Sequence, residues 1–139
     1  MTTTDTTITR QLLDDEQRLS VPAEIFSFDF LRLEMAVYAM TDNLSPDYKG
    51  GFWDFYLLSN GAFFMAPSSD KQFRVVCDNG FEGELSADAL GIVASLYAYS
   101  HQSFGGPSKF AETCAEQYHL LREYMFDHAE VATILSAID

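Results

Sequence analysis

Hydrophobic residues in the first third of the chain recur at the spacing of an amphipathic helix. They are Phe26, Phe30, Leu33, Val37 and Met40. Residues three and four apart share one helix face, so the pattern predicts a first helix over residues 24–41. Glu34 lies roughly 140° around that helix from Asp29, on the side nearer the apolar residues. A carboxylate there needs a polar partner, so it is either a satisfied boundary residue or a functional one.

After a loop that contains Pro46, the hydrophobic period changes to two, which is typical of β-strands. Residues 53–58 and 62–66 flank Asn60-Gly61, and an Asn-Gly pair is a strong signal for a hairpin. Both faces of this hairpin are apolar. A two-residue turn and a three-residue loop that includes Ser59 are therefore both compatible with the sequence.

A second hairpin is predicted from residues 73–77 and 81–85 around Asp78-Asn79-Gly80. A two-residue turn would place Glu82 and Glu84 on the same face as the apolar residues of the first strand. A three-residue loop instead pairs Phe73 with Leu85 and Arg74 with Glu84. Because a shift of one residue moves every side chain to the other face, the three-residue loop is expected.

Three helices are expected after the strands. Ser86 is placed to cap the first, and residues 89–100 carry no charge, so this helix is predicted to be the central buried one. Ser108 is placed to cap the next helix, and Asp127 and Glu130 have capping-box spacing for a short last helix. The element order predicts an α+β fold: a small antiparallel β-meander of about four strands packed with about four helices, one before the sheet and three after it.

The chain of 139 residues has the size of a single domain. Residues 1–17 are expected to form a flexible N-terminal segment, because the start is threonine-rich and Asp14, Asp15 and Glu16 mark an exposed stretch. Residues 18–139 are expected to form one domain. The sequence shows neither a secretory signal nor an apolar run long enough to cross a membrane, so a soluble cytoplasmic protein is predicted.

The charge balance is strongly acidic. With 21 acidic and 8 basic residues the net charge is −13, which argues against stable binding to nucleic acid or to an anionic membrane. An acidic surface is predicted in two places. Four acids follow Arg74 with no basic residue among them, and four lie at helical spacing on the outer face of a predicted helix. They are Asp78, Glu82, Glu84 and Asp88, and then Glu112, Glu116, Glu123 and Asp127.

The sequence offers little that is typical of catalysis. His101, His119 and His128 have no partner at metal-ligand spacing, and the chain contains no nucleophile elbow and no phosphate-binding loop. Cys77 and Cys114 are expected to be small buried thiols. No catalytic residue, metal or cofactor is therefore expected. A small hydrolase that uses Glu34 or the acids of 78–88, and an acidic interaction module, remain as alternatives.

Aromatic residues crowd the junction between the Pro46 loop and the first strand. They are Tyr48, Phe52, Trp53, Phe55 and Tyr56. Such a cluster is compatible with a core, but Trp53 is the one tryptophan and stands close to Gly50-Gly51. Tryptophan is enriched among the residues that dominate binding interfaces. We therefore expect Trp53 to be partly exposed and to bind a partner.

Several long runs resemble the ArdB/KlcA family of antirestriction proteins, and the resemblance covers about residues 18–139. The runs are Leu44-Ser45-Pro46-Asp47-Tyr48, Gly50-Gly51-Phe52-Trp53-Asp54-Phe55-Tyr56, Met65-Ala66-Pro67, residues 77–92 and residues 115–123. The resemblance implies a compact α+β fold and a protein of mobile DNA that relieves type I restriction-modification by the host. It further implies a binding inhibitor that reaches the restriction machinery directly or indirectly.

Within this resemblance, Arg18, Glu34, Trp53 and Asp54 are the residues expected to meet the partner. Arg18 and Glu34 are further expected to pair across the N-terminal segment. The acidic helix face is expected to be solvated and largely dispensable. Mimicry of DNA would instead require carboxylates spaced like phosphates along an extended surface.

Overall fold

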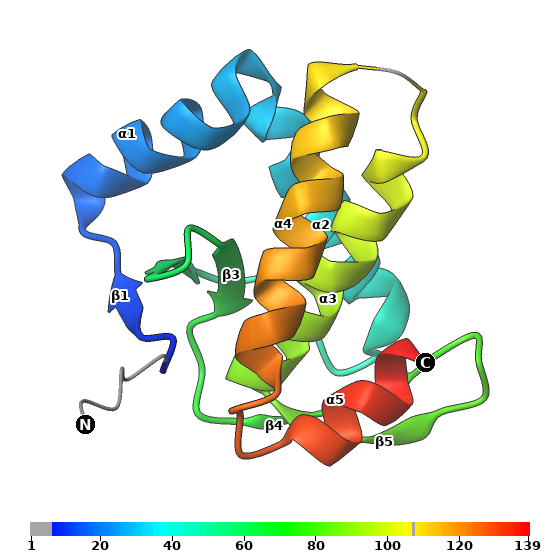
Figure 1. Cartoon of the computed structure of the whole chain (residues 1–139). Helices are drawn as coiled ribbons and strands as arrows, with labels where there is room; N and C mark the ends of the chain where they lie inside the picture. The colour runs from blue at the N-terminus through cyan, green and yellow to red at the C-terminus, as the bar shows by residue number, and fades with distance from the viewer. Residues whose placement is uncertain (1–6, 107) are drawn as a thin grey trace, which may run out of the picture.

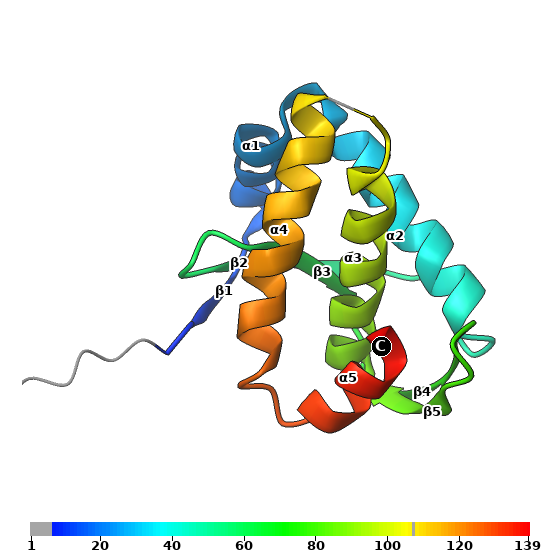
Figure 2. The same cartoon turned by 45° about the vertical axis from the view of Figure 1, so that its right-hand side comes forward.

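The computed structural model describes residues 7–106 and 108–139 and has an α+β architecture, as predicted (Figure 1). Helices α2, α3 and α4 stand side by side with α3 between the other two (Figure 2). The elements are β1 (Arg10–Leu12), α1 (Asp15–Phe26), the 3-10 turn η1 (Ser27–Asp29), α2 (Phe30–Leu44), β2 (Trp53–Leu58), β3 (Phe63–Pro67), β4 (Gln72–Val76), β5 (Glu82–Ser86), α3 (Ala87–Ser103), α4 (Lys109–Met125) and α5 (Val131–Ile138).

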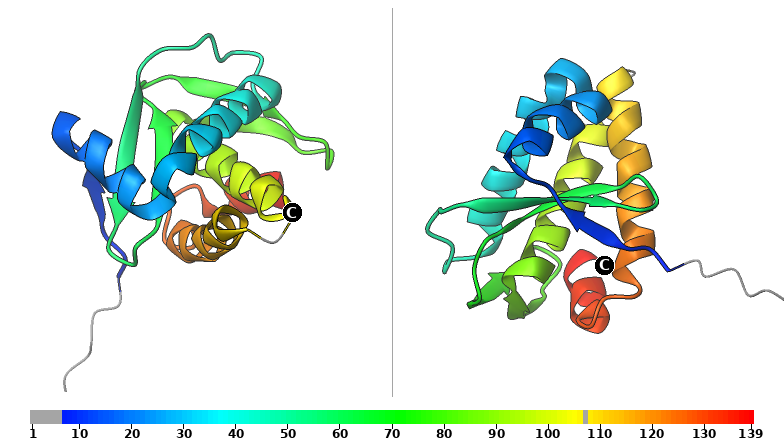
Figure 3. Two further views of the ribbon diagram at one scale, coloured as in Figure 1. Left: turned by 90° about the horizontal axis from the view of Figure 1, so that it is seen from above. Right: turned by 90° about the vertical axis from the view of Figure 1, so that its left-hand side faces the viewer.

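The strands form two separate antiparallel sheets rather than one meander. One sheet has the order β1-β2-β3 and the other is the β4–β5 hairpin. The first sheet runs across the helices when the molecule is seen from the side (Figure 3, right). Strand β3 does not pair with β4, because helices α3 and α4 pack against β3. The predicted meander is therefore divided after β3.

Both hairpins use three-residue loops. In the β4–β5 hairpin Phe73 pairs with Leu85 and Arg74 with Glu84, which confirms the predicted register. The β2–β3 hairpin, for which two turns were compatible with the sequence, closes with a hydrogen bond from the Leu58 amide to the Ala62 carbonyl at 2.8 Å. Gly61 then takes a φ of 93°, in the left-handed region that glycine adopts without steric cost.

The N-terminal part departs from the prediction at two points. The expected flexible segment 1–17 holds strand β1 and the start of α1, while residues 1–6 lie outside the described residues. Asp14 caps α1 by accepting a hydrogen bond from the Gln17 amide at 2.8 Å. The predicted helix 24–41 is in fact two helices, because the chain turns at Ser27, which has a φ of 57°. Apolar spacing continues through this turn, so the sequence pattern hides the break.

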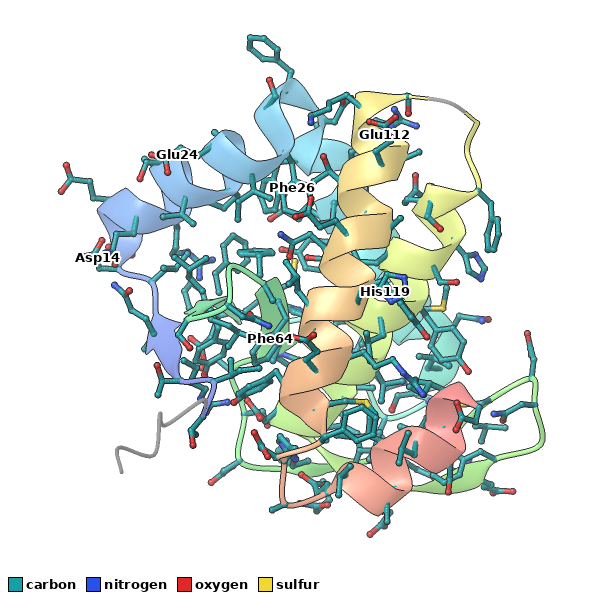
Figure 4. All side chains as sticks on the ribbon, in the orientation of Figure 1. Asp14, Glu24, Phe26, Phe64, Glu112 and His119 are labelled. Atoms are coloured by element: carbon teal, nitrogen blue, oxygen red, sulfur yellow. The ribbon has the colours of Figure 1, made fainter. Side chains whose placement is uncertain are left out.

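Side chains of α1 show how the first helix meets the core. Phe26 points inward from the end of α1 (Figure 4), and its ring lies 5.9 Å from that of Phe63 and 6.1 Å from that of Tyr99. Glu24, two residues earlier, is exposed. Helix α1 therefore covers one end of the contact between β3 and α3.

Helix α3 is the central buried helix, as predicted, and it lies very close to the sheet at Gly91. A Cβ atom at this position would lie 2.3 Å from the Cβ of Ala66 and 2.5 Å from the carbonyl oxygen of Met65. No side chain fits at such distances. The absence of one lets the helix lie directly on the backbone of β3.

Polar side chains satisfy the free edge of β3, which no strand covers. Gln117 of α4 accepts a hydrogen bond from the Phe63 amide at 2.8 Å, and Tyr99 of α3 donates its hydroxyl to the Phe63 carbonyl at 2.6 Å. The Ser95 hydroxyl lies 3.5 Å from the Met65 nitrogen and 3.4 Å from its oxygen. Buried backbone groups without partners are costly, so these side chains replace a fourth strand.

We expect Gly91→Ala to lower the free energy of unfolding by about 1–3 kcal/mol, because the methyl group overpacks the contact with β3. Chemical denaturation measures the difference. His101→Ala on the exposed side of the same helix is the control and should change stability by less than about 0.5 kcal/mol. A Gly91→Ala protein as stable as the parent would show that α3 can move away from β3 without cost.

Candidate functional site

The structure places all four predicted contact residues at or next to the start of β2, and Asp54 is the second residue of that strand. Arg18 comes from α1, Glu34 from α2 and Trp53 from the first position of β2. The Arg18 Nη1 atom donates a hydrogen bond to the Trp53 carbonyl at 2.7 Å. Tyr38 connects Trp53 with Glu34. Its ring lies 5.2 Å from that of Trp53, and its hydroxyl donates a hydrogen bond to Glu34 at 2.9 Å.

Trp53 is buried, with 2% of its surface exposed, so its predicted partial exposure is wrong. Its indole N–H donates to the Tyr48 hydroxyl at 3.0 Å. Side chains alternate along a strand, and β2 turns Trp53 and Phe55 inward together. Trp53 therefore lies beneath the surface and supports the residues around it.

Glu34 and Arg18 do not form the predicted pair. Both residues are described, and no ion pair of 4.0 Å or less joins them. Glu34 is half-buried and has Tyr38 as its hydrogen-bond partner, which supplies the partner that its position requires. Burial, followed by the hydrogen bond and the charge of Glu34, raises the pKa of Tyr38. The tyrosine therefore stays protonated and donates to the carboxylate.

Arg18 is held by aromatic rings instead. Its guanidinium carbon lies 4.0 Å from the centroid of Phe55 and 4.7 Å from that of Phe52. Phe52 is 62% exposed and Asp54 is half-buried. The most exposed residue of this cluster is therefore Phe52, whereas Arg18, Glu34 and Asp54 are all half-buried. Sequence reasoning missed Phe52, because it expected Trp53 to face the solvent. In the structure Trp53 faces inward, and the neighbouring Phe52 is exposed instead.

The predicted acidic surface is mostly exposed, in two places. Asp78, Glu82 and Glu84 belong to the β4–β5 hairpin, and Glu112, Glu116 and Glu123 to α4. Asp127 is exposed too, but α4 ends at Met125, so Asp127 lies in the following turn and not on the predicted helix face.

Asp88 is the exception among the predicted acids, because it is paired and only 25% of its side chain is exposed. Arg10 of β1 donates to its Oδ1 atom at 2.6 Å, and the Nε2 atom of His128 lies 2.8 Å from its Oδ2 atom. The Nδ1 atom of His128 accepts the Glu130 amide at 3.0 Å, which favours the tautomer with the proton on Nε2. Burial alone would raise the pKa of Asp88, but the bonds from His128 and Arg10 outweigh it, and the pKa is lowered.

Glu130 also binds the start of α3, close to Asp88. It does not form the predicted capping box, because α5 has no side-chain cap. Its carboxylate instead accepts hydrogen bonds from the amide and the hydroxyl of Ser86. Ser86 caps α3 as predicted by accepting the Ala89 amide at 3.1 Å.

Other candidate chemistry is limited in the part of the chain that the structure describes. Three or more His, Cys, Asp or Glu residues do not come together there as a metal site, and no described helix is long and apolar enough to cross a membrane. Both cysteines are buried free thiols, as predicted. Burial raises the pKa of Cys114 to about 12, so its reactive thiolate form is disfavoured near neutral pH.

These features define a small acidic α+β protein whose accessible cluster combines a cation, an aromatic ring and a carboxylate. The family model described as "Antirestriction protein" matches residues 46–139. The chain belongs to the ArdB/KlcA family of antirestriction proteins.

Several relatives match over most of their length. Antirestriction protein KlcA of Escherichia coli is 46% identical over 112 residues, which cover 78% of this chain and 76% of that one. A second Escherichia coli KlcA is 38% identical over 142 positions and all of both chains. A solved structure matches with a TM-score of 0.89 and 37% identity over all of both chains. It is described as showing that KlcA and ArdB have a novel fold and antirestriction activity against type I DNA restriction systems in vivo but not in vitro.

We expect Asp88→Asn to lower the free energy of unfolding by about 1–3 kcal/mol at pH 7, because a charge-assisted hydrogen bond is lost. Folding lowers the pKa of Asp88. The stabilisation is therefore present above the unfolded value of about 3.9 and is lost as the pH falls through the folded value. Denaturation curves of parent and variant should converge only once the pH has fallen below the folded pKa of Asp88.

The exposed Asp78→Asn variant is the matched control for this pH series and should behave like the parent protein. A stability difference for Asp88→Asn that stayed constant from neutral to acidic pH would contradict the ion-pair origin of the effect.

Proposed function

We propose that this chain protects incoming DNA in the bacterial cytoplasm by relieving type I restriction, and that it does so by binding rather than by catalysis. The observation that carries the proposal is the match over the whole chain to KlcA and ArdB, whose described activity is directed against type I systems. A fold by itself does not define a function. Here the fold comes with 37% identity over the full length of both chains, so the likeness extends beyond the fold to the sequence.

The described activity of those relatives in vivo but not in vitro bears on the mechanism. A protein that simply occupied the restriction enzyme would inhibit the purified reaction as well. We therefore infer that this chain needs a further cellular component, or acts on a state of the restriction machinery that exists only in the cell. The protein then binds the restriction machinery together with this further component, or it acts on that machinery indirectly.

The carboxylates favour a binder over the alternative of a small hydrolase. A general base works best with a pKa near the operating pH. The pKa of Asp88 is instead lowered by its bonds to His128 and Arg10. Glu34 is already bonded to the Tyr38 hydroxyl. Each of these two acids therefore has a structural partner.

The surface that we propose for the partner is formed by Arg18, Phe52 and Asp54. It joins a large exposed ring, a guanidinium stacked on that ring and a half-buried carboxylate. Interfaces are enriched in aromatic residues and arginine at their centres. Trp53 lies beneath this surface and fixes the carbonyl that Arg18 binds.

The plating efficiency of unmodified phage on a host with a type I restriction system tests the function. Expression of this gene should raise plating by orders of magnitude relative to the empty vector. A host without restriction is the control and should plate equally in both cases. If the gene gives no relief in the restricting host while the protein accumulates in folded form, the proposed function is wrong.

A pair of substitutions tests the surface. We expect Phe52→Ala to lower restriction relief while leaving stability nearly unchanged, because the ring is largely exposed. Trp53→Ala should instead lower the free energy of unfolding by about 3–5 kcal/mol, which is typical of a buried aromatic. Plating assays and thermal unfolding separate the two effects. Full relief by the folded Phe52→Ala protein would remove this surface from the proposal.

The acidic residues of α4 and its end provide a second test. We expect replacement of Glu112, Glu116, Glu123 and Asp127 by their amides to leave restriction relief largely intact, because exposed carboxylates need no partner. Complete loss of relief by the folded quadruple variant would instead indicate that this surface mimics DNA. Salt should then weaken partner binding, because the Debye length is only about 8 Å at 0.15 M.

A further inference from the structure

A cavity of about 230 Å³ lies between two loops that leave the same end of the β2–β3 ladder. Trp53 pairs with Pro67 at that end, and the Ser68 amide donates to the Phe52 carbonyl at 2.8 Å, which keeps the two loops side by side. The first loop contributes Lys49, Gly50 and Gly51 to the walls, and the second contributes Ser68, Ser69 and Lys71.

The charge around this cavity is unusual for a chain with a net charge of −13. Arg10 is paired with Asp88, and Arg18 is held by Trp53 and two phenylalanine rings. Lys49 and Lys71 line one cavity, and neither has an ion pair within 4.0 Å in the described part of the chain. Two like charges near one another favour the binding of an anion between them.

The remaining walls supply donors and room. Ser69 accepts the Lys71 amide at 3.1 Å through its side-chain oxygen, so its hydroxyl proton remains free to donate. Gly50 and Gly51 have φ values of 87° and 122°, and a Cβ atom built on either would meet nothing within 4 Å. A ligand can therefore approach the backbone closely at this loop.

One acidic residue also faces the cavity. Asp47 lines the wall, and its Oδ2 atom accepts the Arg74 amide at 2.8 Å. One carboxylate against two ammonium groups leaves a positive balance among the lining side chains.

Phe52 adds a flat apolar wall. It lines the cavity, is 62% exposed, and has the Arg18 guanidinium 4.7 Å from its ring centroid. Aromatic side chains on which a base can stack are typical of sites for nucleotides. A free anion would make no use of such a wall.

We propose that this cavity is a binding site for a nucleoside monophosphate, with the phosphate between Lys49 and Lys71 and the base on Phe52. The volume of about 230 Å³ is below that of typical pockets for whole ligands, so it suits the phosphate and sugar, while the base lies outside against the exposed ring. The inference concerns ligand binding and stands whether or not this chain relieves restriction.

Titration of the full-length protein with adenosine 5′-monophosphate, followed by amide NMR shifts, tests the site. We expect saturable shifts of Gly50, Gly51, Ser68 and Ser69. Inorganic phosphate should shift the same amides but bind at least about fivefold more weakly, because base stacking is missing. Adenosine without a phosphate should not saturate the site up to about 10 mM.

Matched variants assign the contacts. Lys49→Gln with Lys71→Gln should weaken the nucleotide at least about tenfold, because two charge-assisted contacts are lost. Lys109→Gln, which changes a lysine away from the cavity, should remain within about twofold of the parent. Phe52→Ala should weaken the nucleotide but not inorganic phosphate.

Three results would overturn the inference. They are the absence of saturable shifts at the four amides, equal affinity for inorganic phosphate and the nucleotide, and unchanged binding by the folded double lysine variant. All are direct binding measurements. A failure here is therefore distinct from a failure of the plating experiment.

Discussion

The contact between α3 and β3 fixes the rest of the molecule. Gly91 brings the helix onto the strand backbone, and Tyr99 and Gln117 bond the strand edge that would otherwise be an unpaired ladder. Because β3 is held there, β2 can pair only on its far side, and β1 then pairs beyond β2. This places the start of β2 against α1 and α2, and it brings the two lysine-bearing loops together at the end of the ladder.

Much of this fold could be predicted because its signals are local. The Asp78-Asn79-Gly80 loop sets the β4–β5 register through the position of one left-handed glycine, and the alternative would have mixed acidic and apolar residues on one face. Ser86 and Ser108 cap helices within three residues of their own positions. Residues 89–100 of α3 carry no charge, and this composition alone predicts that the helix is buried. Each inference needed only neighbours in sequence.

The predictions that failed needed partners distant in sequence. The burial of Trp53 depends on the Tyr48 hydroxyl and on α2, and the exposure of Phe52 follows from the same strand phase. Asp88 looked like a surface acid because Arg10 is 78 residues away. The division of one expected meander into two sheets depends on α3 and α4 packing against β3, which no strand pattern reveals. A resemblance to a family brought Arg18 and Glu34 to attention, but it could not say what they touch.

The ion pairs at Asp88 bear on how the protein emerges from the ribosome. Arg10 is synthesised first, Asp88 follows 78 residues later, and His128 follows Asp88 by 40 residues. Gln117, which closes the β3 edge, also comes late. Strand β1 can therefore pair with β2 before α3 exists, but the Arg10 side chain has its partner only once Asp88 has been translated. A nascent chain that lacks α4 would leave the β3 edge without Gln117 and prone to pairing with other chains, so this edge closes only after α4 has been synthesised.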